Sequence, residues 1–345
     1  MDTDDQQRNR SSAETDAPFA GAKAWVITDG KAGSESQARG IADAMGLDWR
    51  LIRVAPSGLA KWIAPFGRPD TTDRFGLPGS EFAPPFPEIA IAIGRRSMPY
   101  LRAVKRAQSK THTVALLDSK GGLGIADVIW VPQHDRLRGP NVVTSLTAPH
   151  GFSPDRLDAL RRNRPSFIDD LPGPRLTVLL GGRNAVYRFQ NADHARFQTA
   201  LSDLARHAGS VLITPSRRTH AELLEAALTA TADRPRYVFD GEQANPYPEL
   251  LAAGDAIVVT ADSISMAAEA LATGRPLLVF HPSRGSRKFS RFHDALLSEG
   301  VARKLEPPFE QFPDWTYAPR DATAEIARDL AHRLNRLMIE TEAGP

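Results

Sequence analysis

The chain has 345 residues, of which 41% are hydrophobic, and its formal net charge at neutral pH is +2. A single hydrophobic core usually stops growing at about 250–300 residues, so this length predicts two domains. Cysteine is absent from the sequence, which excludes disulfides, thiolate metal sites and a cysteine nucleophile. The small net charge gives no reason to expect a nucleic acid as partner.

The first 20 residues are polar, and they contain acidic residues where a secretory signal would be basic and then apolar. We therefore expect residues 1–20 to form a disordered leader. The sequence contains no run that approaches the roughly 18 consecutive apolar residues needed to span a bilayer. These features predict a cytoplasmic protein, and a peripheral position on the inner face of a membrane is compatible with them.

Short apolar strands alternate with helical stretches over residues 21–164, a pattern typical of a parallel α/β domain. The segment 165–174 carries three prolines and no periodic pattern, so it predicts a linker. In this first domain we expect strands at 24–29, 48–54, 88–94, 111–117 and 127–132.

The same alternation restarts over residues 175–319, and the final stretch, 320–345, has the pattern of one amphipathic helix. The fold class is therefore α/β, with two Rossmann-like lobes that each contain a parallel sheet. Open sheets of this kind bind ligands beyond the carboxyl ends of their strands, so the pattern predicts a ligand cleft between the lobes. In the second lobe we expect strands at 175–182, 210–216, 236–240, 255–260 and 276–280.

The most informative segment, 260–280, places a hydroxyl-rich turn between a strand and a helix. Either Asp262 or Ser263 can cap this helix. The helix start, beside Ser263 and Ser265, is suited to an anion because its backbone N–H groups are free. Glu269 lies about one turn further along the same face, where a carboxylate could accept both hydroxyls of a ribose. Ordinary helix capping with a surface glutamate explains these residues equally well.

This arrangement resembles the donor-sugar motif of GT-B glycosyltransferases, in which a helix start with small residues precedes a ribose-binding glutamate. The chain from Ala24 to about Lys304 also resembles the mitochondrial fission family of elongated-mitochondria (Elm-type) proteins and their bacterial relatives. The bacterial relatives are described as predicted nucleoside-diphosphate-sugar enzymes, so the resemblance implies a nucleotide sugar as ligand, with a UDP-sugar favoured. The matching blocks are TDGKAGSESQ (28–37), GRRS (94–97), VPQHDRL (131–137), NPY (245–247), ADSISMAAEA (261–270) and RGSRKFSRFH (284–293).

The loop 28–37 joins the first strand to the first helix, where doubly wound folds place a ligand. Gly30 permits close approach of the backbone, and Lys31 supplies a cation. The glycines lack the GxGxxG spacing, so a conventional dinucleotide site is not predicted. The GT-B resemblance implies that this lobe supplies the catalytic base, either Asp29 or Glu35. A purely structural turn is the alternative.

The first strand of the second lobe ends in Gly181, Gly182 and Arg183, which could form a backbone cradle and a counter-charge for phosphate. A simple turn between strand and helix is the alternative. At the exit of the next strand we expect one arginine, assigned as Arg217, to face the ligand and Arg218 to be solvated.

The basic segment after strand 276–280 is expected to be a flexible loop in which Arg287 and Lys288 close over a diphosphate and neutralise a leaving group. The interleaved Phe289 and Phe292 fit an anionic membrane surface or a nucleic acid about as well.

A second membrane candidate is the segment 58–68, which combines four apolar residues with Lys61 and Arg68. A short helix with an apolar stripe is more often packed on its own lobe, and packing is the outcome we expect here.

Together these patterns predict a nucleotide-sugar-binding protein, either a GT-B-like glycosyltransferase or a nucleoside-diphosphate-sugar epimerase. The second lobe would hold the donor, and the first lobe would hold the acceptor and the base. No cofactor is required, and no metal is predicted because His134 and His150 lack metal-ligand spacing. Membership in a fission family implies the alternative, a non-catalytic peripheral adaptor that recruits a division dynamin.

Overall fold

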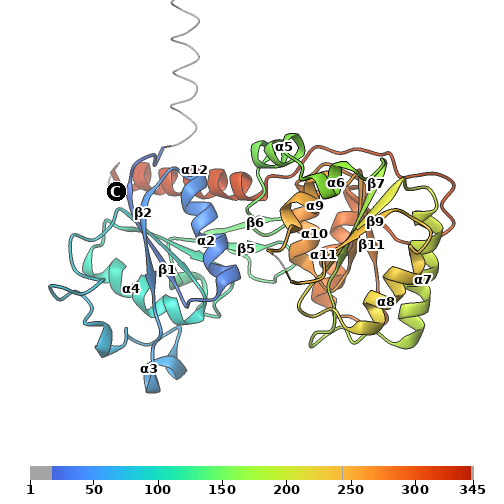
Figure 1. The fold of residues 1–345 in the computed structure, drawn as a ribbon. Coiled ribbons are helices and arrows are strands. Elements are labelled where there is room, and N and C mark those ends of the chain that lie inside the picture. The colour runs from blue at the N-terminus through green and yellow to red at the C-terminus, as the bar shows by residue number, and fades with distance from the viewer. Residues whose placement is uncertain (1–17, 243, 343–345) are drawn as a thin grey trace, which may run out of the picture. The chain divides into compact units, whose positions relative to one another are not determined.

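The computed structural model describes residues 18–242 and 244–342, which form two compact units (Figure 1). The first unit combines the chain up to Gly151 with the C-terminal residues from Ala322 on, and the second unit is Phe152–Asp321. Most of the predicted leader lies outside the described residues. Phe19, inside the predicted leader, is nevertheless buried in the core of the first unit, so the leader prediction was wrong at that residue.

The first unit is built on a six-stranded sheet with the strand order β2-β1-β3-β4-β5-β6, and all of its strand pairs are parallel. Its strands are β1 (Lys23–Thr28), β2 (Asp48–Arg53), β3 (Ile89–Ile93), β4 (His112–Leu116), β5 (Val128–Pro132) and β6 (Val142–Ser145). The helices between them are α2 (Ala32–Ala44), α3 (Gly58–Ile63) and α4 (Met98–Ala107), with short 3-10 turns at Thr71–Asp73, Arg95–Ser97 and Leu123–Ile125.

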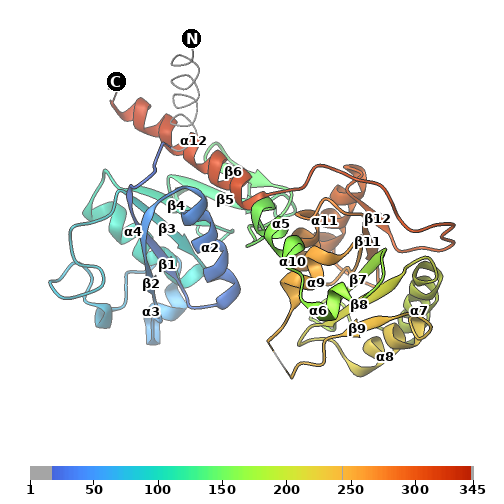
Figure 2. The same cartoon turned by 45° about the horizontal axis from the view of Figure 1, so that its top comes forward.

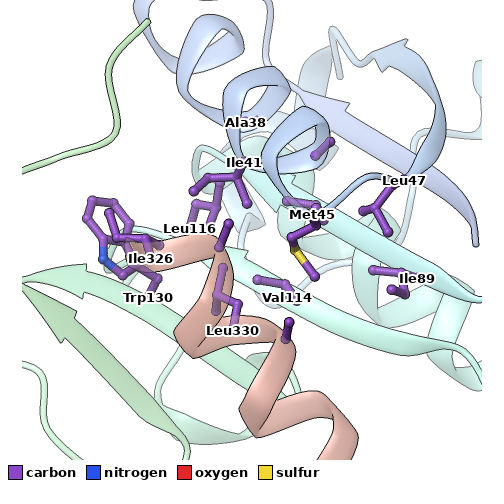
Figure 3. Packing of buried hydrophobic residues seen from close by; sticks show 14 of the residues in the cluster. Ala38, Ile41, Met45, Leu47, Ile89, Val114, Leu116, Trp130, Ile326 and Leu330 are labelled. Atoms are coloured by element: carbon purple, nitrogen blue, oxygen red, sulfur yellow. The ribbon is translucent and has the colours of Figure 1, made fainter. Parts of the chain in front are cut away.

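Helices cover both faces of this sheet because its strands are apolar on both sides. In β1, Val26 contributes to one hydrophobic cluster, whereas Trp25 and Ile27 contribute to the other. The last helix, α12 (Ala322–Glu342), joins the first cluster and packs beside α2 (Figure 3). None of the helices in the described part of the chain has the length and apolar character that crossing a membrane requires.

The second unit has its own six-stranded parallel sheet, with the order β12-β11-β10-β7-β8-β9. Helices α7 and α8 pack against each other, as do α5 and α9 (Figure 2). The strands are β7 (Arg175–Leu180), β8 (Ser210–Pro215), β9 (Arg236–Val238), β10 (Ala256–Thr260), β11 (Leu277–Phe280) and β12 (Ala302–Lys304). The helices are α5 (Pro154–Arg162), α6 (Ser166–Asp169), α7 (Asn191–Ala205), α8 (Ala221–Ala230), α9 (Tyr247–Ala253), α10 (Ile264–Leu271) and α11 (Arg287–Ser298).

The two strand orders define where each unit can bind a ligand. In the first sheet β2 lies on one side of β1 and the later strands are added on the other side, so the order of strand addition reverses between β1 and β3. In the second sheet the order reverses in the same way between β7 and β10. The helices that follow the two strands at such a switch point lie on opposite faces, which leaves a crevice at the carboxyl ends of the strands. Functional side chains are therefore sought after β1 and β3 in the first unit, and after β7 and β10 in the second.

The predicted fold class, two Rossmann-like lobes with parallel sheets, is confirmed. All ten predicted strands are present, and β6 and β12 are two further strands at the sheet edges. The segment 165–174, expected to be a linker, lies inside the second unit and contains α6. The change of unit instead follows Gly151.

Candidate functional site

The switch point of the second unit is organised by Asp262, which follows β10 and has a fully buried side chain. Its carboxylate accepts hydrogen bonds from the amide of Gly182 at 2.8 Å and from the hydroxyl of Thr260 at 2.7 Å. The guanidinium of Arg218 lies 3.1 Å away. Burial raises the pKa of Asp262, although these three partners oppose the shift. Asp262 therefore links the exits of β7, β8 and β10.

Gly181 and Gly182 are glycines because other groups occupy the space of a side chain. A Cβ atom on Gly181 would lie 2.4 Å from the Asp262 carboxylate, and one on Gly182 would lie 1.9 Å from the carbonyl oxygen of Arg218. The Gly181 amide donates to Thr260 at 2.8 Å, and the Gly182 amide donates to Asp262. Both amides therefore already have acceptors within the protein, so the prediction that they form a backbone cradle for phosphate was wrong. The two glycines instead allow close packing of the strand exits.

The three arginines at these strand exits have different surroundings. Arg217, the residue assigned to the ligand from the sequence, and Arg218 are both exposed, and Arg218 forms the ion pair with Asp262. Arg183 donates to the carbonyl of Arg188 at 3.2 Å, and its guanidinium lies 3.7 Å from the carboxylate of Glu222. The arginine that contacts the switch-point carboxylate is therefore Arg218.

Helix α10 begins directly at the switch point. Ser263 is its N-cap and accepts a hydrogen bond from the amide of Met266 at 3.4 Å, so the capping role falls to Ser263 rather than Asp262. Among the described residues, the amides of Ile264 and Ser265 have no acceptor. The side chain of Ser265 is exposed beside them. This helix start can therefore donate two backbone hydrogen bonds to an anion.

Glu269 lies one turn further along α10 and is half-buried. The hydroxyl of Tyr247, the first residue of α9, donates a hydrogen bond to its carboxylate. Burial raises the pKa of Glu269, and the hydrogen bond from Tyr247 opposes this shift in part. Burial and the nearby Glu269 charge also raise the pKa of Tyr247. The sequence indicates Tyr247 only as part of the NPY block, and the fold brings it into contact with Glu269.

The basic segment after β11 is ordered, and this corrects the expected flexible loop. Arg287 and Lys288 are the first two residues of α11, and Ser286 caps the helix. The phenol ring of Tyr187, from the loop after β7, packs edge-on against Phe289. His293 of α11 lies 2.8 Å from the carbonyl oxygen of Ala261. The helix that carries these cations is thereby attached to the exits of β7 and β10.

The loop between β11 and α11 is anchored at its start by Asp193, a buried residue of α7. The amide and hydroxyl of Ser283 donate to the Asp193 carboxylate at 2.8 and 2.6 Å. Burial opposes ionisation of this carboxyl, but the bonds from Ser283, Gln190 and Arg196 outweigh it and lower the pKa of Asp193 to about 2. The ionised carboxylate of Asp193 therefore holds the start of the loop between β11 and α11 in place.

In the first unit, Asp29 follows β1 at the switch point and its side chain is only 3% exposed. Its Oδ2 atom lies 3.2 Å from the Lys31 ammonium, and its Oδ1 atom has no hydrogen-bond partner among the described residues. Gly94, which follows β3, has a φ of +91°, and a Cβ atom there would lie 2.8 Å from the Asp29 carboxyl carbon. Asp29 is therefore a buried carboxylate that pairs with Lys31 through one oxygen, while its other oxygen is buried without a hydrogen bond to any described residue.

Glu35, the other candidate base, has a different environment. Its carboxylate accepts two hydrogen bonds from the guanidinium of Arg53, at 2.7 and 2.9 Å, and the guanidinium of Arg39 lies 3.7 Å from the carboxylate. The hydrogen bond from Arg53 outweighs desolvation and lowers the pKa of Glu35. A carboxylate held in this way is a weaker base, so the surroundings favour Asp29 over Glu35. Gly30, which follows Asp29, has a φ of +80°, a conformation that glycine adopts readily.

With this geometry established, comparison with known proteins gives the family. The sequence profile described as "Mitochondrial fission ELM1" matches residues 32–334. The chain belongs to the mitochondrial fission ELM1 family. A relative within the ELM1 family, the mitochondrial fission protein ELM1 of Arabidopsis thaliana, is 30% identical over an alignment of 277 positions that covers 72% of this chain and 65% of that protein. The chain thus spans slightly less than two thirds of the length of this plant relative.

Two solved structures show a weaker likeness to this ELM1-family chain. The UDP-GlcNAc 2-epimerase from Methanocaldococcus jannaschii is 10% identical with a TM-score of 0.47, and the alignment covers 92% of this chain and 99% of that one. The glycosyltransferase SnogD from Streptomyces nogalater is 15% identical with a TM-score of 0.47, covering 94% of this chain and 100% of that one. The strand orders, rather than these scores, define the fold here.

Proposed function

We propose that this ELM1-family chain binds a nucleotide sugar, with a UDP-sugar favoured, at the β7/β10 switch point of its second unit. The observation that carries the proposal is helix α10, whose start has two unused amides and whose next turn carries Glu269. The start of a helix favours a diphosphate, and a carboxylate one turn away favours the paired hydroxyls of a ribose. We expect a protein with this function to be located in the cytoplasm.

The cations around α10 fit a diphosphate. Arg287 and Lys288 begin α11, which His293 fastens to the residue next to Asp262. When a sugar is transferred from a nucleoside diphosphate, negative charge develops on the departing diphosphate, and nearby guanidinium and ammonium groups stabilise it without a metal. The basic helix start thus has both the charge and the anchoring that this role needs.

Asp29 is the proposed base for the chemical step. Inverting transfer needs a general base that removes the proton of the acceptor hydroxyl, epimerisation needs one that removes a proton from the sugar, and a carboxylate can serve in either role. Asp29 sits at the switch point of the first unit, and its Oδ1 atom has no partner among the described residues. These features support a GT-B-like glycosyltransferase or a nucleoside-diphosphate-sugar epimerase.

A thermal-shift panel of nucleoside diphosphates and nucleotide sugars tests the binding proposal. A ligand at 100 times its dissociation constant adds about 2.7 kcal/mol to the apparent free energy of unfolding. We expect UDP and UDP-sugars to raise the melting temperature clearly, and uridine to raise it less because it lacks the diphosphate. A panel in which no nucleotide changes the melting temperature would contradict the proposal.

Family membership supports a second candidate, a non-catalytic peripheral adaptor that recruits a division dynamin. An adaptor could retain nucleotide binding, so binding alone does not separate the two functions. Product formation does: a UDP-sugar is incubated with the protein and a hydroxyl compound that can accept the sugar, and chromatography should show an epimer, or free UDP together with the glycosylated acceptor, in amounts far above those from an Asp29→Asn variant. Equal amounts from both proteins would favour the adaptor.

A further inference from the structure

Four apolar side chains of the first unit are exposed on α3 and the turn that follows it. The relative exposure is 73% for Leu59, 77% for Trp62, 43% for Ile63 and 63% for Phe66, and no residue of α3 is buried. Leu59, Trp62 and Ile63 have the spacing of one helix face. The expectation that this segment packs on its own lobe was therefore wrong.

Polar contacts, rather than burial, hold the carboxyl end of this segment in place. The guanidinium of Arg95 donates to the carbonyl oxygens of Trp62 at 3.0 Å and Ala64 at 2.5 Å. The guanidinium of Arg102 donates to the carbonyl oxygen of Phe66 at 2.7 Å. These bonds satisfy backbone carbonyls at the end of α3, which the helix cannot satisfy by itself.

The other end of the segment is fixed by Asp70, which is buried. Its carboxylate accepts hydrogen bonds from the amide and the hydroxyl of Ser57, and from the amide and the hydroxyl of Thr72. These bonds hold the pKa of Asp70 well below its usual range. The segment is thus ordered at both ends while its large apolar side chains remain in solvent, a costly arrangement for a surface with no partner.

The charge around these side chains is positive. Lys61 and Arg68 belong to the same segment and are exposed, and the guanidinium groups of Arg95 and Arg102 lie against its backbone. Residues 58–68 contain no aspartate or glutamate. The nearest acidic residue in the sequence, Asp70, faces inward to Ser57 and Thr72 rather than outward.

We propose that the α3 surface, meaning Leu59, Trp62, Ile63 and Phe66 with Lys61 and Arg68, docks this protein onto an anionic lipid bilayer. Tryptophan, phenylalanine and leucine enter the boundary between headgroups and acyl chains, while lysine and arginine bind the anionic headgroups. Helix α3 lies beyond the end of the first sheet (Figure 1). The inference goes beyond the proposed function and does not depend on it.

Co-sedimentation of the full chain with vesicles tests this proposal. One set of vesicles contains equal parts of phosphatidylglycerol and phosphatidylcholine, and the other contains phosphatidylcholine alone. We expect strong binding to the anionic vesicles, and at least tenfold weaker binding for a Leu59→Ser, Trp62→Ser, Phe66→Ser triple variant. Removing one cation, by Lys61→Ala or Arg68→Ala, should weaken binding about fivefold, which corresponds to about 1 kcal/mol for each cation near the surface.

Ile339→Ser is the matched control, because Ile339 of α12 is also an exposed apolar residue, at 58%. It should bind anionic vesicles as the unmodified chain does, and thermal melting should show that every variant is folded. The proposal is overturned if the unmodified chain does not sediment with anionic vesicles, or if the triple variant binds as well as the control. Concentration-dependent dimerisation without vesicle binding, abolished in the triple variant, would overturn it in favour of a second copy of the chain as partner.

Discussion

Glycine at position 94 decides where the carboxylate of Asp29 can lie. The backbone of Gly94 has a φ of +91° and leaves no room for a side chain beside Asp29. We expect Gly94→Ala to lower the free energy of unfolding by about 1–3 kcal/mol, because it strains the backbone and displaces a buried carboxylate. Urea denaturation measures this loss.

Gly33 provides the matched control for this substitution. It lies in α2, its φ is not positive, and a Cβ atom there would meet no atom within 4 Å. Gly33→Ala should leave the free energy of unfolding unchanged or slightly raised, since alanine favours a helix. If both alanine variants had equal stability, close packing of Gly94 on Asp29 would not be the reason for glycine at 94.

The raised pKa of Glu269 predicts opposite pH dependences for stability and for ligand binding. Because folding favours the protonated carboxyl, the stability that it contributes is fully present below the ordinary value of 4.5 and is lost as the pH rises through the raised value. Ribose hydroxyls bind best to the ionised carboxylate, so nucleotide affinity should rise over the same interval. Chemical denaturation and calorimetry across this range measure the two quantities, and Glu269→Gln should abolish both slopes.

The site residues show what the sequence could and could not predict. Local residue order predicts a helix cap after β10, because capping involves only neighbours, but it left Asp262 and Ser263 as alternatives, and the structure shows that Ser263 is the cap. The ion pair of Arg218 with Asp262 joins residues 44 positions apart, so the sequence offered no means of choosing between two adjacent arginines. The same holds for Tyr247, whose partner Glu269 lies 22 positions further along the chain.

At the scale of elements, the start of α11 predicts a preference for phosphate. Arg287 is exposed in the first turn of this helix. Arg287→Ala should weaken binding of UDP about tenfold or more, because charge-assisted hydrogen bonds to phosphate contribute about 1.5–3 kcal/mol. Binding of uridine, which carries no phosphate, should change little. Equal losses for UDP and uridine in calorimetry would show that α11 does not contact the diphosphate.

The two strands that the sequence did not predict, β6 and β12, are short and show little periodicity in their residues. β12 has three residues, of which only Ala302 is buried, and β6 has four half-buried residues, so neither shows a clear period. The pattern of α12 predicted an amphipathic helix, and the structure shows that this helix packs beside α2 in the first unit. That contact joins the two ends of the chain, and no local pattern specifies such a pairing.

At the scale of the whole molecule, restarting of the strand pattern correctly predicted two parallel sheets. The division between the units differed because α5 belongs with the second unit. Helix α5 packs on α9, and Arg161 of α5 donates to the carbonyl oxygens of Ala252 and Thr273. The prolines of 165–174 indicated irregular backbone, and irregular backbone can lie inside a unit as well as between units.

The most direct test of the account is calorimetry of a UDP-sugar with Glu269→Gln. This change keeps the size of the side chain and removes its charge, and hydrogen bonds to a charged acceptor contribute about 1.5–3 kcal/mol, so affinity should fall about tenfold or more. Glu225→Gln, at an exposed position of α8, is the control and should bind normally. A 2′,3′-dideoxy nucleotide should bind the unmodified chain weakly and be indifferent to Glu269→Gln. Equal losses for both ligands, or no nucleotide binding by the unmodified chain, would contradict the account.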